Sequence, residues 1–244
     1  MLFKDFLIQL LQYHKIQFQL GDLKELNGFD GVYLNDKALV FLIKDEHSDL
    51  DKIQKLEDFS LKHQIRFIQI NKEEFIQSSQ LLKNRILSLF KIRNRIHGRL
   101  CEVQQITKSE ADEFLQFNHS LGTTGAPNRY GLFYQQKLMA VACFSKAKIM
   151  TYEAIPYYSY VWERYASISD STVIGGMSKL LNAFIKDSGA KHIMTYADLN
   201  WGTGNAFKKL GFKEVSRKQF NTGSNDFQSA QHTVSSLKYI LDLR

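Results

Sequence analysis

The sequence predicts an α/β (α+β) protein, in which a mixed sheet with flanking helices follows a smaller α/β region. Short apolar runs with strand character alternate with amphipathic segments of helical period along the chain. The 244 residues suffice for one large or two modest domains, and 44% hydrophobic and 23% charged residues are ordinary for a globular protein. Only Pro127 and Pro156 occur, so no proline-rich linker is expected.

The first 97 residues are expected to form a small α/β domain. Apolar residues at helical spacing predict a first helix over residues 2–16, which ends before Gly21 and Asp22. The remaining expected elements are strands at 29–34, 38–43 and 65–70 and helices at 49–63 and 72–93.

The second domain is expected to span residues 98–244. Thr107 followed by Glu110 matches a capping box, which predicts a helix as far as Asn118. Gly175 and Gly176 precede another helix, which Gly189 ends. The remaining expected elements are strands at 100–106, 130–134, 138–145, 162–168, 192–197 and 212–216 and a short helix at 205–210.

The formal net charge is +7, and the stretch between Phe75 and Cys101 contains no acidic residue. Two interpretations stay open for this basic stretch: a solvated helix face, or a surface that binds nucleic-acid or cofactor phosphates. The candidate nucleic-acid-binding residues are Lys83, Lys91, Arg93, Arg95 and Arg99.

No apolar run reaches eighteen residues, and the N-terminus lacks the features of a signal peptide, so we expect a cytoplasmic protein without a membrane partner. Cys101 and Cys143 match no metal-ligand spacing and are expected to be free structural thiols.

The glycine pair before the expected helix at 177–186 is a candidate anion site. Glycine allows backbone amides to approach a ligand closely, and a helix N-terminus favours negative charge. A pyrophosphate is a natural occupant, and Lys179 would add positive charge. The alternative is that Gly175 and Gly176 form only a tight turn.

The segment after the strand at 192–197 reads GNAFKKLGF, in which Asn205, Leu210, Gly211 and Phe212 match a signature of the GNAT acyltransferases. Over roughly residues 100–218 the chain resembles this superfamily, and residues 173–181 stand where the family has its pantetheine pyrophosphate loop. The resemblance implies acetyl-CoA or another acyl-CoA as cofactor. Its candidate binding residues are Ile174, Gly175, Gly176, Ser178, Lys179 and Asn205.

A narrower resemblance is to phage-associated proteins of the Mom type, which modify DNA. Five motifs occur in the same order: Asn118-His119, YGLF at 130–133, WERY at 162–165, GGMSKLL at 175–181 and TYAD at 195–198. The resemblance implies modification of adenine in DNA and an iron bound by histidine and carboxylate. His119 and Asp198 are the candidate metal ligands, and a third ligand is not identified.

Four residues are candidate catalytic groups: His119, Glu163, Tyr196 and Asp198. His119 follows a helix, so it is either a ligand or catalytic residue or a C-terminal cap. Asp198 ends a strand, where it either acts as base or ligand or forms a turn. Tyr196 is a proton donor or ordinary packing. Glu163 and Arg164 are expected to point to opposite faces of their strand.

The N-terminal region resembles the Vsr-type endonuclease-like fold over residues 24–75. That family uses clustered carboxylates around Mg²⁺. Here the second core strand, residues 38–43, is wholly apolar, and Asp30 and Glu25 are the remaining candidates. We therefore expect a degenerate domain that binds DNA or packs against its neighbour.

Three functional hypotheses follow. The first is a GNAT-like N-acyltransferase acting on a nucleobase or another amine, with acyl-CoA and DNA as partners. The second is a DNA-binding module without turnover, and the third is an acetyltransferase for a small molecule or protein. The sequence makes no prediction of oligomeric state.

Overall fold

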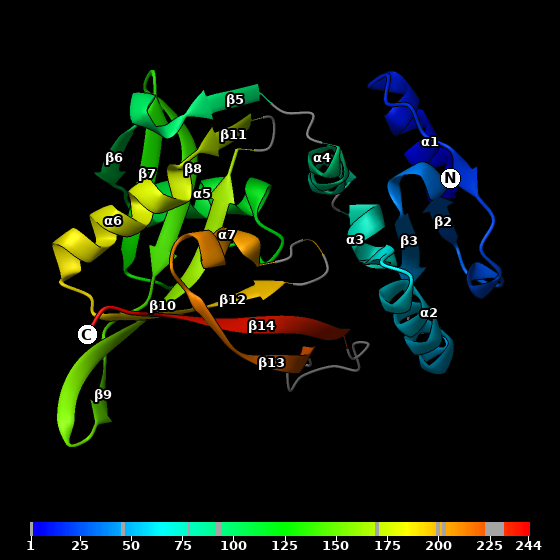
Figure 1. The fold of residues 1–244 in the computed structure, drawn as a ribbon. Helices are drawn as coiled ribbons and strands as arrows, with labels where there is room; N and C mark the ends of the chain where they lie inside the picture. Colours follow the sequence, from blue (N-terminus) through cyan, green and yellow to red (C-terminus); the bar gives the residue numbers. More distant parts are fainter. Residues whose placement is uncertain are drawn as a thin grey trace. The chain divides into compact units, whose positions relative to one another are not determined.

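The computed structural model describes residues 2–44, 47–77, 79–90, 94–168, 171–198, 201, 204–222 and 232–244. The chain divides into two compact units. Unit 1 consists mainly of Met1–Ile86, and unit 2 mainly of Leu87–Phe220 and Thr233–Arg244. Figure 1 shows the elements of each unit.

Unit 1 is built on a four-stranded sheet in the order β1-β2-β3-β4. The first three strands form an antiparallel meander, and β4 runs parallel to β3. Its elements are α1 (Phe3–Tyr13), β1 (Leu20–Gly21), η1 (Lys24–Leu26), β2 (Gly31–Leu34), η2 (Asn35–Lys37), β3 (Leu39–Lys44), α2 (Leu50–Lys62), β4 (Arg66–Asn71), α3 (Lys72–Gln77) and α4 (Ser79–Leu89).

The core of unit 1 lies on both faces of β3, whose first five residues are buried. Val40 and Leu42 pack against Ile53 and Leu56 of α2. A strand covered on both faces reads as a continuous apolar run, which explains the sequence at 38–43. Asp49 begins α2 by accepting hydrogen bonds from the amides of residues 51 and 52.

Unit 2 contains an eight-stranded mixed sheet in the order β13-β14-β12-β10-β8-β7-β6, with β9 paired to β10. A separate two-stranded ribbon joins β5 and β11. The elements are β5 (Asn94–His97), η3 (Gly98–Leu100), β6 (Glu102–Gln105), α5 (Lys108–Asn118), β7 (Asn128–Tyr134), β8 (Lys137–Phe144), β9 (Lys148–Tyr152), β10 (Ile155–Ser167), β11 (Ser171–Ile174), α6 (Gly176–Ser188), β12 (His192–Asp198), α7 (Asn205–Lys209), β13 (Lys213–Thr222) and β14 (His232–Asp242).

Helices α5 and α6 cover opposite faces of this sheet, because the side chains of β8 alternate between them. Val141 and Cys143 pack with α5, whereas Ala142 and Phe144 pack with α6. Helix α5 begins with the expected capping box at Thr107. The expected mixed sheet with flanking helices is therefore confirmed.

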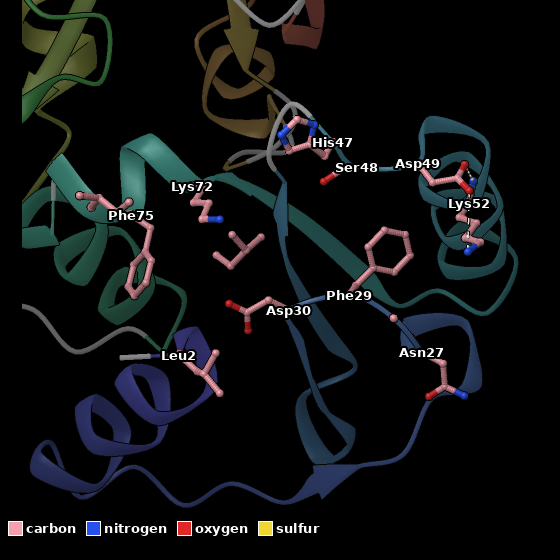
Figure 2. Close-up of a pocket in the computed structure, with 13 residues that line it drawn as sticks. Leu2, Asn27, Phe29, Asp30, His47, Ser48, Asp49, Lys52, Lys72 and Phe75 are labelled. Carbon is pink, nitrogen blue, oxygen red and sulfur yellow. Dashed lines mark hydrogen bonds and ion pairs between the residues drawn. The ribbon is translucent and has the colours of Figure 1, made fainter.

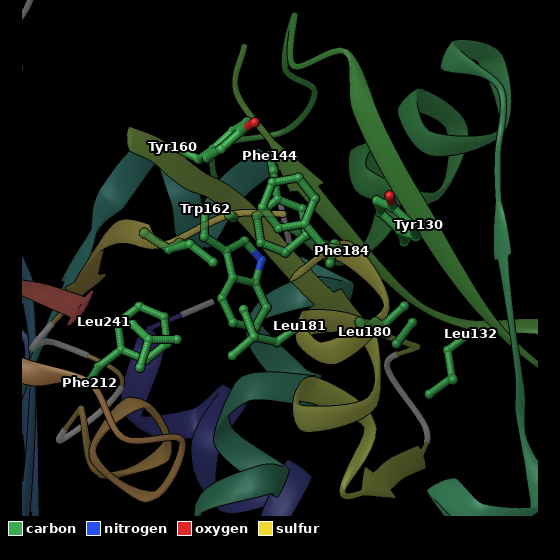
Figure 3. Close-up of a cluster of buried hydrophobic side chains, with 14 of the residues drawn as sticks. Tyr130, Leu132, Phe144, Tyr160, Trp162, Leu180, Leu181, Phe184, Phe212 and Leu241 are labelled. Carbon is green, nitrogen blue, oxygen red and sulfur yellow. The ribbon is translucent and has the colours of Figure 1, made fainter. Parts of the chain in front are cut away.

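An aromatic cluster forms the core between the sheet and α6 (Figure 3). The ring of Phe184 stacks on Phe144 with centroids 3.9 Å apart, and the ring of Trp162 also stacks on Phe144, with centroids 5.1 Å apart. Tyr160 meets Phe184 edge-on at 5.1 Å. These contacts fix β10 above α6.

Several elements differ from the sequence prediction. Where one helix is expected over 72–93, the described residues form α3 and α4, with residue 78 between them outside the description, and the chain is in a strand, β5, by Asn94. The strand expected at 162–168 begins earlier, at Ile155, and pairs with the unpredicted β9. In the described part of the chain, no helix is long and apolar enough to cross a membrane.

Candidate active site

The two parallel strands in the centre of unit 2 separate partway along their length. β10 and β12 pair only from Ser159 opposite His192 to Trp162 opposite Thr195. Beyond this point β10 stays paired with β8 as far as its own residue Ser167. β12 stays paired with β14 as far as its own residue Asp198. Their facing edges are therefore left without a strand partner among the described residues, which creates an opening at the carboxyl end of the parallel pair.

A β-bulge in β10 marks the point of separation. Trp162 pairs with Phe144 and Arg164 with Cys143, so Glu163 is the extra residue in β10. Thr195 stabilises the start of the opening because its hydroxyl donates to the carbonyl of Trp162 at 3.0 Å. The indole of Trp162 in turn donates to the carbonyl of Arg164 at 2.9 Å.

The bulge overturns the expectation that Glu163 and Arg164 point to opposite faces. Both side chains reach the loop between α5 and β7. The carboxylate of Glu163 accepts a short hydrogen bond from the hydroxyl of Thr124. The guanidinium of Arg164 donates to the carbonyls of Gly122 and Thr123 at 3.3 and 3.5 Å. An extra residue breaks the alternation of a strand, which the sequence pattern did not reveal.

The predicted residues Tyr196 and Asp198 lie on the exposed face of β12. Thr195 and Ala197 point into the core, so the two alternating residues share the opposite side of the strand. Tyr196 is 38% exposed, and it lies beyond the last paired position of β12 with β10. Both side chains therefore belong to the strand that borders the opening.

The predicted residue His119 ends α5. Its backbone amide donates to the carbonyl of Leu115, and its Nδ1 accepts from the amide of Leu121 at 3.1 Å. The described side-chain contact is thus with the loop after the helix rather than with a helix carbonyl, and the role of His119 as ligand, catalytic group or cap stays a prediction. This contact orders the first turn of the loop that continues to Thr124.

The glycine loop before α6 has the geometry expected of an anion site. Gly175 has a φ of +78°, and no atom lies within 4 Å of the position a Cβ would take. The amides of Gly176, Met177 and Ser178 have no acceptor among the described residues, as is usual in a first helical turn. Open space and three free donors are available at the start of a 13-residue helix.

Lys179 is engaged within the protein. Its amine donates to the carbonyl of Gly98 at 3.1 Å and forms a short bond to that of Cys101. Gly98 packs so closely that a Cβ there would lie 2.9 Å from the carbonyl oxygen of Ile174. η3 therefore packs against the glycine loop, and the hydrogen bonds of Lys179 hold η3 there.

The remaining predicted cofactor residues border this loop or a neighbouring helix. Ile174 is 44% exposed and directly precedes Gly175, and Ser178 is half-buried in the first turn of α6. Asn205 is exposed as the first residue of α7. Phe212, at the end of the LGF motif, is buried beside Trp162, so that part of the signature serves the core.

The predicted basic stretch is divided between the two units. Lys83 lies on α4 in unit 1, above the ring of Phe6 at 6.0 Å. Arg95 on β5 and Arg99 on η3 are exposed in unit 2. Lys91 and Arg93 lie outside the described residues. The stretch is thus no single helix face, contrary to the solvated-helix interpretation.

The buried thiols of unit 2 take no part in this opening. Cys143 is fully buried, and burial raises the pKa of its thiol to about 12. Burial also raises the pKa of Cys101. Both thiols are free, as the sequence indicates, and both stay protonated at neutral pH.

No group of three histidine, cysteine or carboxylate side chains is close enough to bind a metal ion in the described part of the chain. His119 and Asp198 therefore have no third protein ligand there.

Unit 1 contains a cavity of about 770 Å³ at the end of its sheet where β2 begins and β3 ends. Figure 2 shows the carboxylate of Asp30 between the rings of Phe29 and Phe75, with Lys72 pointing into the same space. The amide of Phe3 donates to Asp30 at 3.5 Å. The exposed Glu25 on η1 does not line this cavity.

Sequence reasoning missed three residues of the candidate site in unit 2: Thr124 and Thr195 at the opening, and Gly98 beside the glycine loop. Each acts on a residue distant in the chain, so no local pattern identifies it. The only sequence signal was the proximity of Thr195 to Tyr196 in the TYAD motif.

No protein-family model and no curated protein matches the chain. Solved structures that resemble it include the ribosomal-protein-S18-alanine N-acetyltransferase of Escherichia coli, at 13% identity and a TM-score of 0.42 over 59% of this chain and 94% of that one. A Bacillus subtilis acetyltransferase in complex with CoA has 16% identity and a TM-score of 0.41, covering 59% and 98%. The Drosophila melanogaster polyamine N-acetyltransferase has 10% identity and a TM-score of 0.44, covering 59% and 100%.

Proposed function

We propose that unit 2 is a GNAT-like N-acyltransferase that takes an acyl-CoA as donor. The observation that carries the proposal is the opening between β10 and β12, with a carboxylate at the bulge of one strand and a helix in the same unit whose first amides have no acceptor among the described residues. Transfer to an amine needs a base that removes a proton and a donor that stabilises negative charge on oxygen. Residues of both kinds border the opening.

Glu163 is the proposed general base. It belongs to the bulge, and its carboxylate is oriented by the hydroxyl of Thr124. A carboxylate fixed at a strand bulge can accept a proton from an amine that approaches from the loop side. Tyr196, on the other strand of the opening, is the proposed proton donor to the leaving group. His119 and Asp198 are then proposed to line the acceptor side.

The first turn of α6 fits the phosphates of the donor. The amides of Gly176, Met177 and Ser178 supply hydrogen bonds, and the open space at Gly175 permits close approach. Ile174 and Asn205 are proposed to contact the rest of the donor. An acyl-CoA, when bound, supplies an acyl group activated as a thioester. Lys179 is proposed to act indirectly, because its amine holds η3 against the loop.

DNA, with a nucleobase amine as acceptor, is the proposed substrate. The motifs shared with the Mom type and the exposed cations Arg95 and Arg99 beside the glycine loop support it. Phosphate contacts by such cations supply affinity that depends on salt rather than sequence. Iron at His119 and Asp198 would lack a third protein ligand among the described residues, and metal analysis of the purified chain tests whether it is bound.

The decisive measurement is calorimetric titration of acetyl-CoA into wild type and Ser178→Asp. An added carboxylate in the first turn favours the helix but repels a phosphate, so stability should be kept while affinity falls about tenfold or more. Ser109→Asp makes the same change in the first turn of α5 and should bind like wild type. Wild type that fails to bind acetyl-CoA, or equal binding by all three proteins, would contradict the proposed donor site.

The second candidate function is DNA binding without acyl transfer. The hydrogen bonds of the Lys179 amine to backbone carbonyls favour this second function, because the glycine loop then has one cation fewer for the phosphates of an acyl-CoA. Salt-dependent affinity for duplex DNA, combined with no heat from acetyl-CoA, would establish this alternative.

A further inference from the structure

The hairpin formed by β9 and the first part of β10 extends beyond the rest of the sheet in unit 2. Residues 155–158 of β10 pair only with β9, since pairing with β12 begins at Ser159. β9 in turn pairs only with β10 among the described residues. Its outer edge is therefore an unpaired row of backbone donors and acceptors, which is a template for another strand.

This hairpin exposes large apolar side chains on both faces. Cross-strand partners share a face, so Met150 lies with Tyr157, and Ile149 lies on the other face with Tyr158. The exposed members are Ile149 (64%), Met150 (40%), Tyr152 (58%), Ile155 (68%) and Tyr158 (58%). A two-stranded hairpin without a covering layer is marginal in water, and an apolar patch of this kind marks an interaction surface.

The composition of the hairpin indicates a protein partner rather than nucleic acid. Tyrosine, methionine and isoleucine dominate, as in the centre of protein interfaces, whereas a nucleic-acid-binding arm is rich in arginine and lysine. The nearby Arg244 stacks on Tyr157 at 4.1 Å and is neutralised by Asp242 at 2.6 Å. The remaining charges on the hairpin and its base are Lys146, Lys148 and Glu153.

The position of these charges favours a second copy of the chain in antiparallel orientation. Lys148 begins β9, with Lys146 two residues before it, and the other end of β9 leads into Glu153. An antiparallel pairing brings unlike ends together, whereas a parallel one brings like charges together. With a two-fold axis at Met150, Lys148 lies opposite Tyr152 of the second copy, and no like charges face each other.

We propose that the chain forms a symmetric dimer in which β9 pairs antiparallel with β9 of a second copy around Met150. The two sheets of unit 2 become one continuous sheet, and the apolar side chains on both faces of the hairpins are buried at the junction. Such an isologous contact is the commonest form of homodimer.

The test is sedimentation of the full chain over a range of concentrations, with Met150→Lys and Met150→Glu. Across a two-fold axis, each variant places like charges directly opposite each other, so the dimer dissociation constant should rise roughly tenfold or more. An equimolar mixture of the two variants should recover the dimer, because Lys then faces Glu. Val215→Lys alters an apolar residue of similar exposure (55%) on β13 and should sediment like wild type.

Recovery of the dimer in the mixture establishes the proposed register, since misfolded variants could not complement each other. A wild type that stays monomeric overturns the proposal, as does a dimer that all three variants leave intact. A monomeric wild type that binds duplex DNA, with affinity lost in Met150→Glu and kept in Val215→Lys, overturns it in favour of a nucleic-acid-binding arm.

Discussion

The main sheet of each unit contains a pair of adjacent parallel strands, and these two pairs behave differently. In unit 1, β3 and β4 stay in register over six residues, from Leu39 opposite Arg66 to Lys44 opposite Asn71. In unit 2, β10 and β12 pair over four residues and then separate, although both strands continue. β3 has no bulge in its pairing with β2 or β4, whereas β10 has one at Glu163.

The difference shows how a parallel pair becomes a site. A continuous ladder satisfies its own backbone groups and leaves only the strand ends for ligands, as at the cavity beside Asp30. A bulge ends the ladder early, turns a carboxylate out of the alternating pattern and leaves an opening in the middle of the sheet. The bulge in unit 2 is therefore the feature that the proposed chemistry depends on.

The largest expected effect is on turnover, from Glu163→Gln. The amide keeps the size of the side chain but cannot accept the proton of an amine, so acyl transfer should fall roughly 10²- to 10⁴-fold. Acetyl-CoA affinity should be unchanged, because Glu163 is proposed to act on the acceptor. Thiol release from acetyl-CoA in the presence of duplex DNA, compared with calorimetric binding, separates the two quantities.

Glu113→Gln provides the matched control, because this glutamate is exposed on α5. Its turnover should equal that of wild type. If Glu163→Gln retains full turnover, Glu163 is not the base, and the opening loses its proposed catalytic role.

A smaller effect is expected on stability, from Thr195→Val. This near-isosteric change removes the buried hydroxyl that donates to the carbonyl of Trp162. We expect a loss of about 1–2 kcal/mol in the free energy of unfolding, measured by urea titration. Thr172→Val changes an exposed threonine of β11 and should stay within about 0.5 kcal/mol of wild type. Equal stability of both variants would show that the bond does not stabilise the start of the opening.

The smallest expected effect is on the pH dependence of stability. It concerns the end of the β10–β12 pair where pairing begins, at Ser159 and His192. There the Nδ1 of His192 and the hydroxyl of Ser159 share a hydrogen bond of 2.8 Å. Burial lowers the pKa of His192 from 6.5, with smaller opposing and supporting effects of Asp242, Arg244 and Lys238. The unfolded chain therefore takes up the proton first as pH falls, and the stability that neutral His192 provides is lost below about pH 6.5.

The check on this linkage is thermal unfolding of wild type and His192→Asn between pH 5 and 8. An asparagine keeps a hydrogen-bonding group near Ser159 but does not titrate, so its melting temperature should fall less on acidification. If the melting temperatures of both proteins fall by the same amount on acidification, His192 does not contribute to the pH dependence of stability.

The sequence predicted those elements that carry a strong local signal. The capping box at Thr107 and the glycine at 189 placed the ends of α5 and α6 to within two residues, because caps satisfy backbone groups of their own helix. The hairpin of β9 and β10 was missed. Its turn at Glu153 and Ala154 has positive φ without glycine or asparagine, so the usual turn signal is absent.

Two positions of the candidate site carry a local sequence signal, whereas their roles as cofactor-binding and catalytic residues stay predictions. Gly175 and Gly176 do begin a helix with free amides, and Glu163 does lie at the opening. The role of Lys179 in holding η3 could not be predicted, because its acceptors at Gly98 and Cys101 are about eighty residues away. The pairing of Glu163 with Thr124 is a contact over 39 residues for the same reason.

The sequence by itself determined the α/β class, the buried strands and those helix ends that carry a capping signal. These depend on periodicity and capping within a few residues of the chain. Only the tertiary structure decided where β10 leaves β12 and which way Glu163 points, because a bulge is defined by the strand on the other side. It also left the outer edge of β9 without a strand partner among the described residues, since strand order arises from pairing between distant segments.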